Sequence, residues 1–256
     1  TLDLGDMGVL SFDTTGGGLV GTAANDDLLP SAYEEVWHSV GSTANGTTGI
    51  GAKNVLGYRG TFAGVNLSAG YSKANTGTAS GDGGNTGVGS NGSTFDWNLS
   101  TTVPYVEGLT LAGGVAHTDS AALNADLLSD TLDTKSWTGH LLYTSGATSM
   151  GYRRAESQVG TTAGAGNNAE AYSIAYNVND SLTVSYAEQD LEYDKLRVGI
   201  LTATKDLTET ENVKAFNAAY TIGAATVRGT LSTADNAGGV TGIKDEHMEV
   251  SLVLAF

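Results

Sequence analysis

Residues 247–256 read HMEVSLVLAF, and the alternation within this stretch decides the fold. Apolar side chains stand at every second position from Met248 to Phe256. Smaller or more polar side chains stand between most of them. Successive side chains of a β-strand point to opposite faces. The stretch therefore predicts a strand with one apolar face and one small or polar face.

The same alternation recurs along most of the chain. It predicts about 12 strands in all. They cover residues 2–4, 56–62, 65–72, 95–99, 109–115, 137–143, 150–152, 171–178, 182–186, 215–222, 227–231 and 247–256.

The predicted connections alternate between short turns and long polar segments. Tight turns are expected near residues 63–64, 105–108, 145–146, 179–180 and 222–223, and long connections over 75–93, 119–133, 157–168, 190–209 and 235–244. A transmembrane β-barrel has this asymmetry, whereas a soluble sandwich has no reason to segregate its loops so regularly. We therefore expect an all-β, antiparallel up-and-down barrel that forms a single domain over residues 1–256.

Composition excludes several other classes. The chain has 256 residues, no cysteine, 36 glycines and a formal charge of −16. Disulfides and thiolate metal sites are therefore impossible, and nucleic-acid binding is not expected because phosphate contacts need a basic surface. No apolar run approaches the ~18 residues of a transmembrane helix. The second face of the strands is rich in Gly, Ala, Ser, Thr and Asn, which leaves room for water inside a barrel.

Three stretches carry a family resemblance. Residues 54–68 (NVLGYRGTFAGVNLS) and the C-terminal end resemble the general porins of bacterial outer membranes, and residues 222–228 (IGAATVR) resemble a hairpin of alphaproteobacterial porins. The resemblance implies a Gram-negative outer membrane, contacts with lipid and lipopolysaccharide, a homotrimer and a barrel of 16 strands. It also implies that Phe256, with Leu252 and Leu254, forms the signal read by the barrel-assembly machinery.

Residues 8–53 lack clear strand alternation. In the porins that the chain resembles, a loop at this place folds into the barrel and narrows the pore. This segment carries the candidate acidic residues of the constriction, which are Asp13, Asp26, Asp27, Glu34 and Glu35. Ser31 to Glu34 reads as a capping box that opens a short helix through Val40. Because one strand precedes the segment, we expect strands to be missing from this sequence; a true 12-stranded barrel is the alternative.

Three arginines are candidates for the basic side of the constriction. Strand alternation places Arg59, Arg153 and Arg228 on the inner face, and Arg154 on the outer face or at its rim. Acidic and basic residues that face each other across a narrow throat create a transverse field. The alternative is that each arginine is a wall residue paired with a neighbouring carboxylate.

The remaining polar residues suggest little further chemistry. His38, His117, His140 and His247 are far apart in sequence without metal-ligand spacing, and no Ser/His/Asp cluster indicates an enzyme. We expect His140 and His247 to face the lumen, and we expect no cofactor. Asp190, Glu192 and Asp194 offer oxygen ligands for Ca²⁺ on an acidic loop, although their spacing matches no defined calcium loop.

These features predict a general-diffusion porin. Small hydrophilic solutes and ions would cross a water-filled barrel passively, with a weak preference for cations because of the acidic excess. The alternatives are a substrate-specific outer-membrane channel, a secreted or surface β-rich adhesin, and a barrel enzyme. An adhesin would be soluble without detergent, and an enzyme would need a convergent cluster of catalytic side chains.

Overall fold

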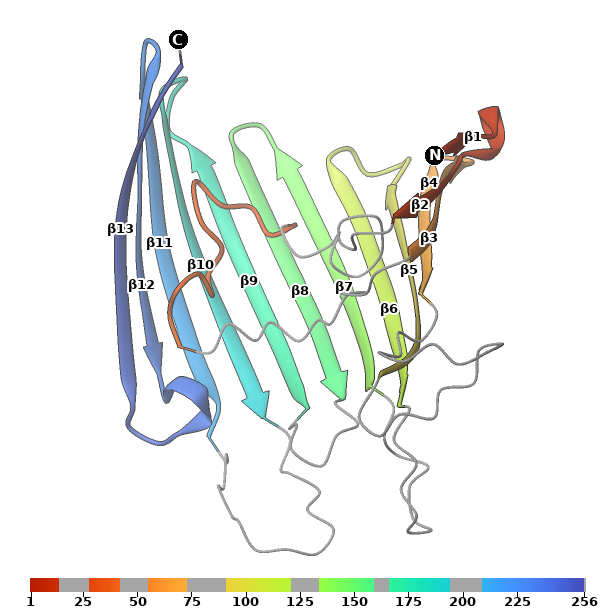
Figure 1. Ribbon diagram of the computed structural model, residues 1–256. Helices are drawn as coiled ribbons and strands as arrows, with labels where there is room; N and C mark the ends of the chain where they lie inside the picture. The colour runs from red at the N-terminus through yellow and green to blue at the C-terminus, as the bar shows by residue number, and fades with distance from the viewer. Residues whose placement is uncertain are drawn as a thin grey trace, which may run out of the picture.

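The chain forms one antiparallel sheet in the computed structural model (Figure 1). The structure describes residues 1–13, 28–41, 55–72, 91–120, 134–158, 166–193 and 209–255. No helix in these ranges is long and apolar enough to cross a membrane.

The sheet has 13 strands, and each pairs with its neighbours in sequence, from β1 at one end to β13 at the other. Two short 3-10 turns, η1 (Gly5–Met7) and η3 (Ala237–Gly239), lie between strands. The strands are β1 (Leu2–Asp3), β2 (Val9–Asp13), β3 (Val55–Phe62), β4 (Val65–Ser72), β5 (Asn91–Thr102), β6 (Leu109–Ser120), β7 (Thr134–Ser145), β8 (Thr148–Gln158), β9 (Asn167–Asn177), β10 (Leu182–Tyr193), β11 (Glu211–Ile222), β12 (Ala225–Asp235) and β13 (Lys244–Leu254).

The eleven predicted strands that follow residue 53 are all present, and the up-and-down order is confirmed. The short turns after β3, β5, β7, β9 and β11 lie together at one end of the sheet (Figure 1). Several strands run further into the predicted long connections than expected; β10, for example, continues to Tyr193.

One strand more than predicted is present, and it corrects the prediction for residues 8–53. Residues 9–13 form β2, which pairs with β3 through Leu10 with Tyr58 and Phe12 with Leu56. Its sequence, VLSFD, places apolar residues on both faces, so alternation alone does not identify it. Residues 9–13 therefore belong to the sheet and not to the predicted infolded loop.

The two faces of the sheet differ in chemistry. We call the face that residues 28–41 contact the inner face, and the opposite face the outer face. One outer row crosses five strands as Ile174, Tyr186, Phe216, Leu231 and Met248, all of them exposed. The neighbouring inner row consists of Ala175, Ser185, Asn217, Thr230 and Glu249. Strand alternation thus separates an apolar outer face from a small and polar inner face.

Residues 28–41 form bends and turns, and the helix predicted from Ser31 through Val40 is wrong. Ser31 makes one bond of a cap, since its hydroxyl oxygen accepts the N–H of Tyr33 (3.2 Å), and the hydroxyl donates to the carbonyl of Glu34 (2.7 Å). The N–H groups of Ala32 and Glu34, however, donate to the wall, at Ser185 Oγ (2.8 Å) and Asn217 Oδ1 (3.3 Å). Side chains of the sheet thus accept backbone N–H groups that would otherwise lie at the start of a helix.

Candidate functional site

Residues 28–41, which we call the infolded segment, lie on the inner face against the wall formed by β8 to β13 (Figure 1). The polar anchors run along its length. After the bonds of Ala32 and Glu34, the Asn217 amide donates to the Glu34 carbonyl (3.1 Å). At the far end, the Gly41 N–H donates to Asp245 Oδ2 (2.9 Å).

Apolar contacts hold the middle of the infolded segment. Its buried side chains are Leu29, Val36, Trp37 and Val40, and they pack against wall residues Ala171, Ala187, Val213, Ala215 and Ala234. Four of these five wall residues are alanines, so the segment can approach the sheet closely. At Gly151 the approach is closer still, because a Cβ there would lie 2.5 Å from Cδ of Pro30.

Two of the three arginines predicted to face the constriction lie beneath aromatic rings of the infolded segment. Arg153 Cζ lies 5.0 Å from the centre of the Trp37 ring, and Arg228 Cζ lies 4.8 Å from that of Tyr33. Both distances fit cation–π contacts. Strand alternation assigned both arginines to the inner face, where they lie. Arg153, however, is fully buried, so its charge acts from beneath the segment rather than at a water-exposed surface.

The acidic residue Glu34 contacts a histidine of the same infolded segment. Glu34 Oε2 lies 3.3 Å from His38 Nδ1. Glu35 is half-buried in the same turn. The Tyr33 hydroxyl donates to the carboxylate of Glu249 on β13, and this hydrogen bond raises the pKa of Tyr33 above its ordinary value. Tyr33 therefore links the segment to the last strand as a neutral donor.

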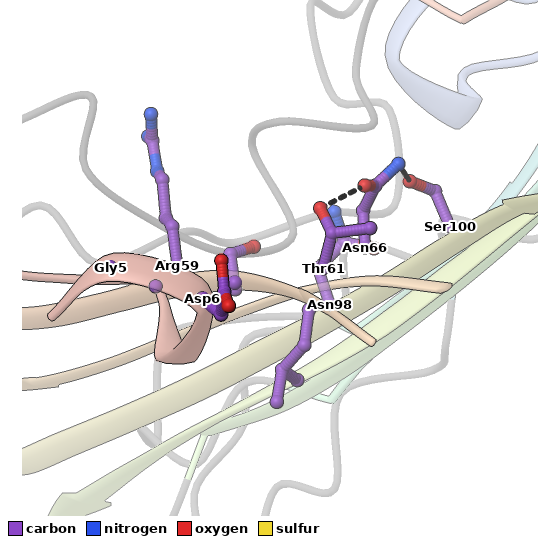
Figure 2. A pocket seen from close by; sticks show the side chains of 11 residues that line it. Gly5, Asp6, Arg59, Thr61, Asn66, Asn98 and Ser100 are labelled. Carbon is purple, nitrogen blue, oxygen red and sulfur yellow. Dashed lines mark hydrogen bonds between the residues drawn. The ribbon is translucent and has the colours of Figure 1, made fainter. Parts of the chain in front are cut away.

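Arg59 lies apart from the other two arginines, in a polar hollow of about 850 Å³ at the β3–β5 part of the inner face (Figure 2). Asp6 of η1 lines the same hollow. The Thr61 hydroxyl donates to Asn66 Oδ1 (2.7 Å), and the Asn66 amide donates to Ser100 (3.4 Å). The Arg59 side chain is thus exposed to water and is surrounded by small polar side chains of the inner face.

The other predicted site residues are dispersed. Asp13 belongs to β2, and Leu252 and Leu254 are exposed on the outer face of β13. Asp26, Asp27 and Phe256 lie outside the described residues. The structure therefore brings Arg153, Arg228 and Glu34 to one region of the inner wall and places Arg59 in another.

The acidic loop predicted to hold Ca²⁺ is not a loop where the structure describes it. Asp190 and Glu192 belong to β10, and Asp190 Oδ1 accepts a hydrogen bond from the Asn212 amide (2.5 Å). Asp194 lies outside the described residues. The expectation of a loop at 190–192 is therefore wrong, and no observation supports calcium there.

Sequence reasoning missed the aromatic residues Tyr33 and Trp37 and the pairing of His38 with β13. The rings of His38 and His247 are 5.7 Å apart, although 209 positions separate them in the chain. The alternation of residues 247–256 does place His247 and Glu249 inward. Nothing in the sequence tells which wall residues Tyr33, Trp37 and His38 contact.

Comparisons with known proteins agree with this fold. No family model and no curated protein matches the chain. Three similar solved structures are a porin refined at 1.8 Å resolution, the anion-selective porin from Comamonas acidovorans, and OmpT, an outer membrane protein of Vibrio cholerae. Their sequence identities are 17%, 15% and 16%, and their TM-scores are 0.65, 0.64 and 0.57. The matches cover 98%, 98% and 97% of this chain and 79%, 75% and 76% of those chains, respectively.

The similarity therefore extends over nearly the whole chain. At such low sequence identity it shows a shared fold and does not show a shared activity. The resemblance seen in the sequence is confirmed at that level: the chain has the fold of the bacterial outer-membrane porins.

Proposed function

We propose that the chain is a general-diffusion porin in the outer membrane of a Gram-negative bacterium. It would carry small hydrophilic solutes and ions passively through a water-filled barrel, with a weak preference for cations. The observation that carries this proposal is the opposition of the two faces. An exposed apolar outer face suits lipid, and a polar inner face with an infolded segment suits a narrowed aqueous path.

The outer face also supports contact with the membrane surface. Charged side chains on the outer face of β7 to β13 gather toward the strand ends that lead into the long connections. Those that the structure describes are Lys135, Arg154, Glu156, Glu170, Glu188, Asp190, Glu192, Lys214, Asp235, Lys244 and Glu246. Such a polar rim above an apolar band suits the lipid headgroups and lipopolysaccharide that we propose as partners. A homotrimer and recognition of Leu252, Leu254 and Phe256 by the barrel-assembly machinery remain part of the proposal.

The constriction that we propose combines the infolded segment with the arginines. Glu34 and Glu35 supply negative charge on the segment, and Arg59, Arg153 and Arg228 supply positive charge on the wall. Asp13, Asp26 and Asp27 remain candidates for the acidic side. A substrate-specific channel and a surface adhesin remain the alternatives. The exposed apolar outer face disfavours the adhesin, because a soluble protein rarely exposes so large an apolar surface.

Single-channel recording in a planar bilayer tests the proposal. We expect stepwise insertions of channels with ohmic current. Under a salt gradient, the reversal potential should indicate a mild selectivity for cations. Arg59→Gln should raise the ratio of K⁺ to Cl⁻ permeability by about two- to fivefold, because a unit charge acting over a few ångströms of water is worth about 1 kcal/mol or less.

Arg154→Gln is the matched control, since it removes the same charge from the outer face. It should leave the permeability ratio as in the wild type. If folded protein carries no current, general diffusion is refuted. Equal effects of the two arginine variants would remove Arg59 from the conducting path.

A further inference from the structure

Two histidines and a glutamate converge where the infolded segment meets the last strand. His38 Nε2 lies 3.4 Å from Glu249 Oε2, and His247 Nε2 lies 3.6 Å from the same oxygen. One ligand atom from each of the three residues lies within 4.8 Å of the other two. The three side chains thus aim their donor atoms at one small volume on the inner face.

The spacing of these donors suits a small metal ion. In a tetrahedral site with metal–ligand bonds of about 2.0–2.1 Å, neighbouring ligand atoms lie about 3.3 Å apart. The two His–Glu distances lie close to that value. His247 Nε2 is also shielded from water and has no hydrogen-bond partner among the described residues. A bound cation would satisfy this buried nitrogen.

Neighbouring groups hold the first three in orientation. Glu34 Oε2 lies 3.3 Å from Nδ1 of His38, which leaves Nε2 of that ring directed at Glu249. Tyr33 donates its hydroxyl hydrogen bond to the other carboxylate oxygen of Glu249. A metal-binding histidine ordinarily donates a hydrogen bond from its second ring nitrogen to a carboxylate or carbonyl. This bond fixes the orientation of the ring and its tautomer.

We propose that His38, His247 and Glu249 bind one divalent transition-metal ion of the Zn²⁺ class on the inner wall. Two imidazoles and one carboxylate favour such an ion over Ca²⁺ or Mg²⁺, which prefer all-oxygen sites. Three protein ligands leave a fourth position for water. Because His38 belongs to the infolded segment and the other two residues to β13, the ion would clamp the segment to the wall. The binding site stands without the proposed function, whereas any effect of the clamp on current rests on it.

Metal titration of the purified, detergent-solubilised protein tests the site. After treatment with EDTA and removal of the chelator, Zn²⁺ should bind with a stoichiometry of one ion per chain in calorimetry. Co²⁺ should give the intense visible absorption of a four-coordinate site. Mg²⁺ and Ca²⁺ should not compete at equal concentration.

Variants assign the ligands. His38→Gln and His247→Gln each remove a ligand and should weaken Zn²⁺ binding by more than about 100-fold. Glu34→Gln removes only the orienting carboxylate and should weaken binding by about tenfold. His117→Gln is the matched control, because it removes an imidazole from the outer face of β6 and should bind as the wild type does. Heat-modifiable gel mobility verifies that each variant is folded.

Failure of the wild-type protein to bind Zn²⁺ would overturn the proposal, as would unchanged binding in folded His38→Gln and His247→Gln. In either case the three side chains form only a cluster of polar groups without a metal. The titration needs no bilayer, so its failure is distinguishable from failure of the channel function.

Discussion

Trp37→Ala is expected to release the infolded segment from the inner face. Trp37 is only 7% exposed, packs among the wall alanines and covers the fully buried guanidinium of Arg153. Removing a buried Trp side chain costs about 3–5 kcal/mol. The substitution would also open a cavity beside a buried charge, which water would enter. The docked arrangement should therefore lose most of its advantage over the undocked one.

The absence of cysteine provides a direct measurement of this release. Ala171 is fully buried beneath the segment, so a cysteine in its place reports whether the segment is docked. In the Ala171→Cys background, Trp37→Ala should speed labelling by a water-soluble maleimide by about 100-fold or more, since each 1.4 kcal/mol is a factor of ten. Under the proposed function, single-channel conductance should rise as well, because the segment would no longer narrow the path.

Tyr105→Ala provides the control for loss of an aromatic ring, because Tyr105 is 97% exposed in the turn between β5 and β6. Its labelling rate should equal that of the parent. If Trp37→Ala labels no faster than this control, then packing of Trp37 is not what holds the segment, and its polar anchors hold it instead.

Leu99→Arg is expected to destabilise the protein in a lipid bilayer by up to about 2–4 kcal/mol, the largest cost of an arginine on the lipid face of a barrel. Leu99 lies on the outer face of β5, level with Leu67 of β4, and is 39% exposed. Urea unfolding of protein folded into phosphatidylcholine vesicles measures the free energy.

The neighbouring substitution Ser100→Arg supplies the comparison. Ser100 is the next residue of the same strand but lines the inner hollow with Arg59. It should change the unfolding free energy by less than about 1 kcal/mol, while shifting selectivity toward anions. Equal losses of stability at the two positions would contradict the assignment of the outer face to lipid.

Strand alternation predicted the sheet well because it depends only on local spacing. Residues 247–256, 171–178 and 215–222 place most of their large apolar side chains on one face, and the structure confirms this for the described residues. The inward positions of Arg59, Arg153 and Arg228 follow from the same rule. Alternation fails for Val9–Asp13, where both faces carry apolar residues and only the pairing with β3 identifies a strand.

The site was less predictable because its contacts are not local. The pattern of Ser31 to Glu34 indicates a helix start, but Ser185 and Asn217 accept the N–H groups of Ala32 and Glu34. Likewise, the charges of Arg153 and Arg228 suggest partners among the acids, whereas aromatic rings cover both. Sequence spacing alone cannot reveal such partners.

The long sequence separation of these contacts has a consequence for the order of folding. Each strand pairs with its neighbours in sequence, so the sheet can grow hairpin by hairpin. The infolded segment, made early, must wait for partners 153 positions ahead at Ser185 and 204 positions ahead at Asp245. Closing loops of that length is slow compared with pairing neighbouring strands. We therefore expect the sheet to form first with its inner face open, and the infolded segment to dock only afterwards, once both β10 and β13 are in place.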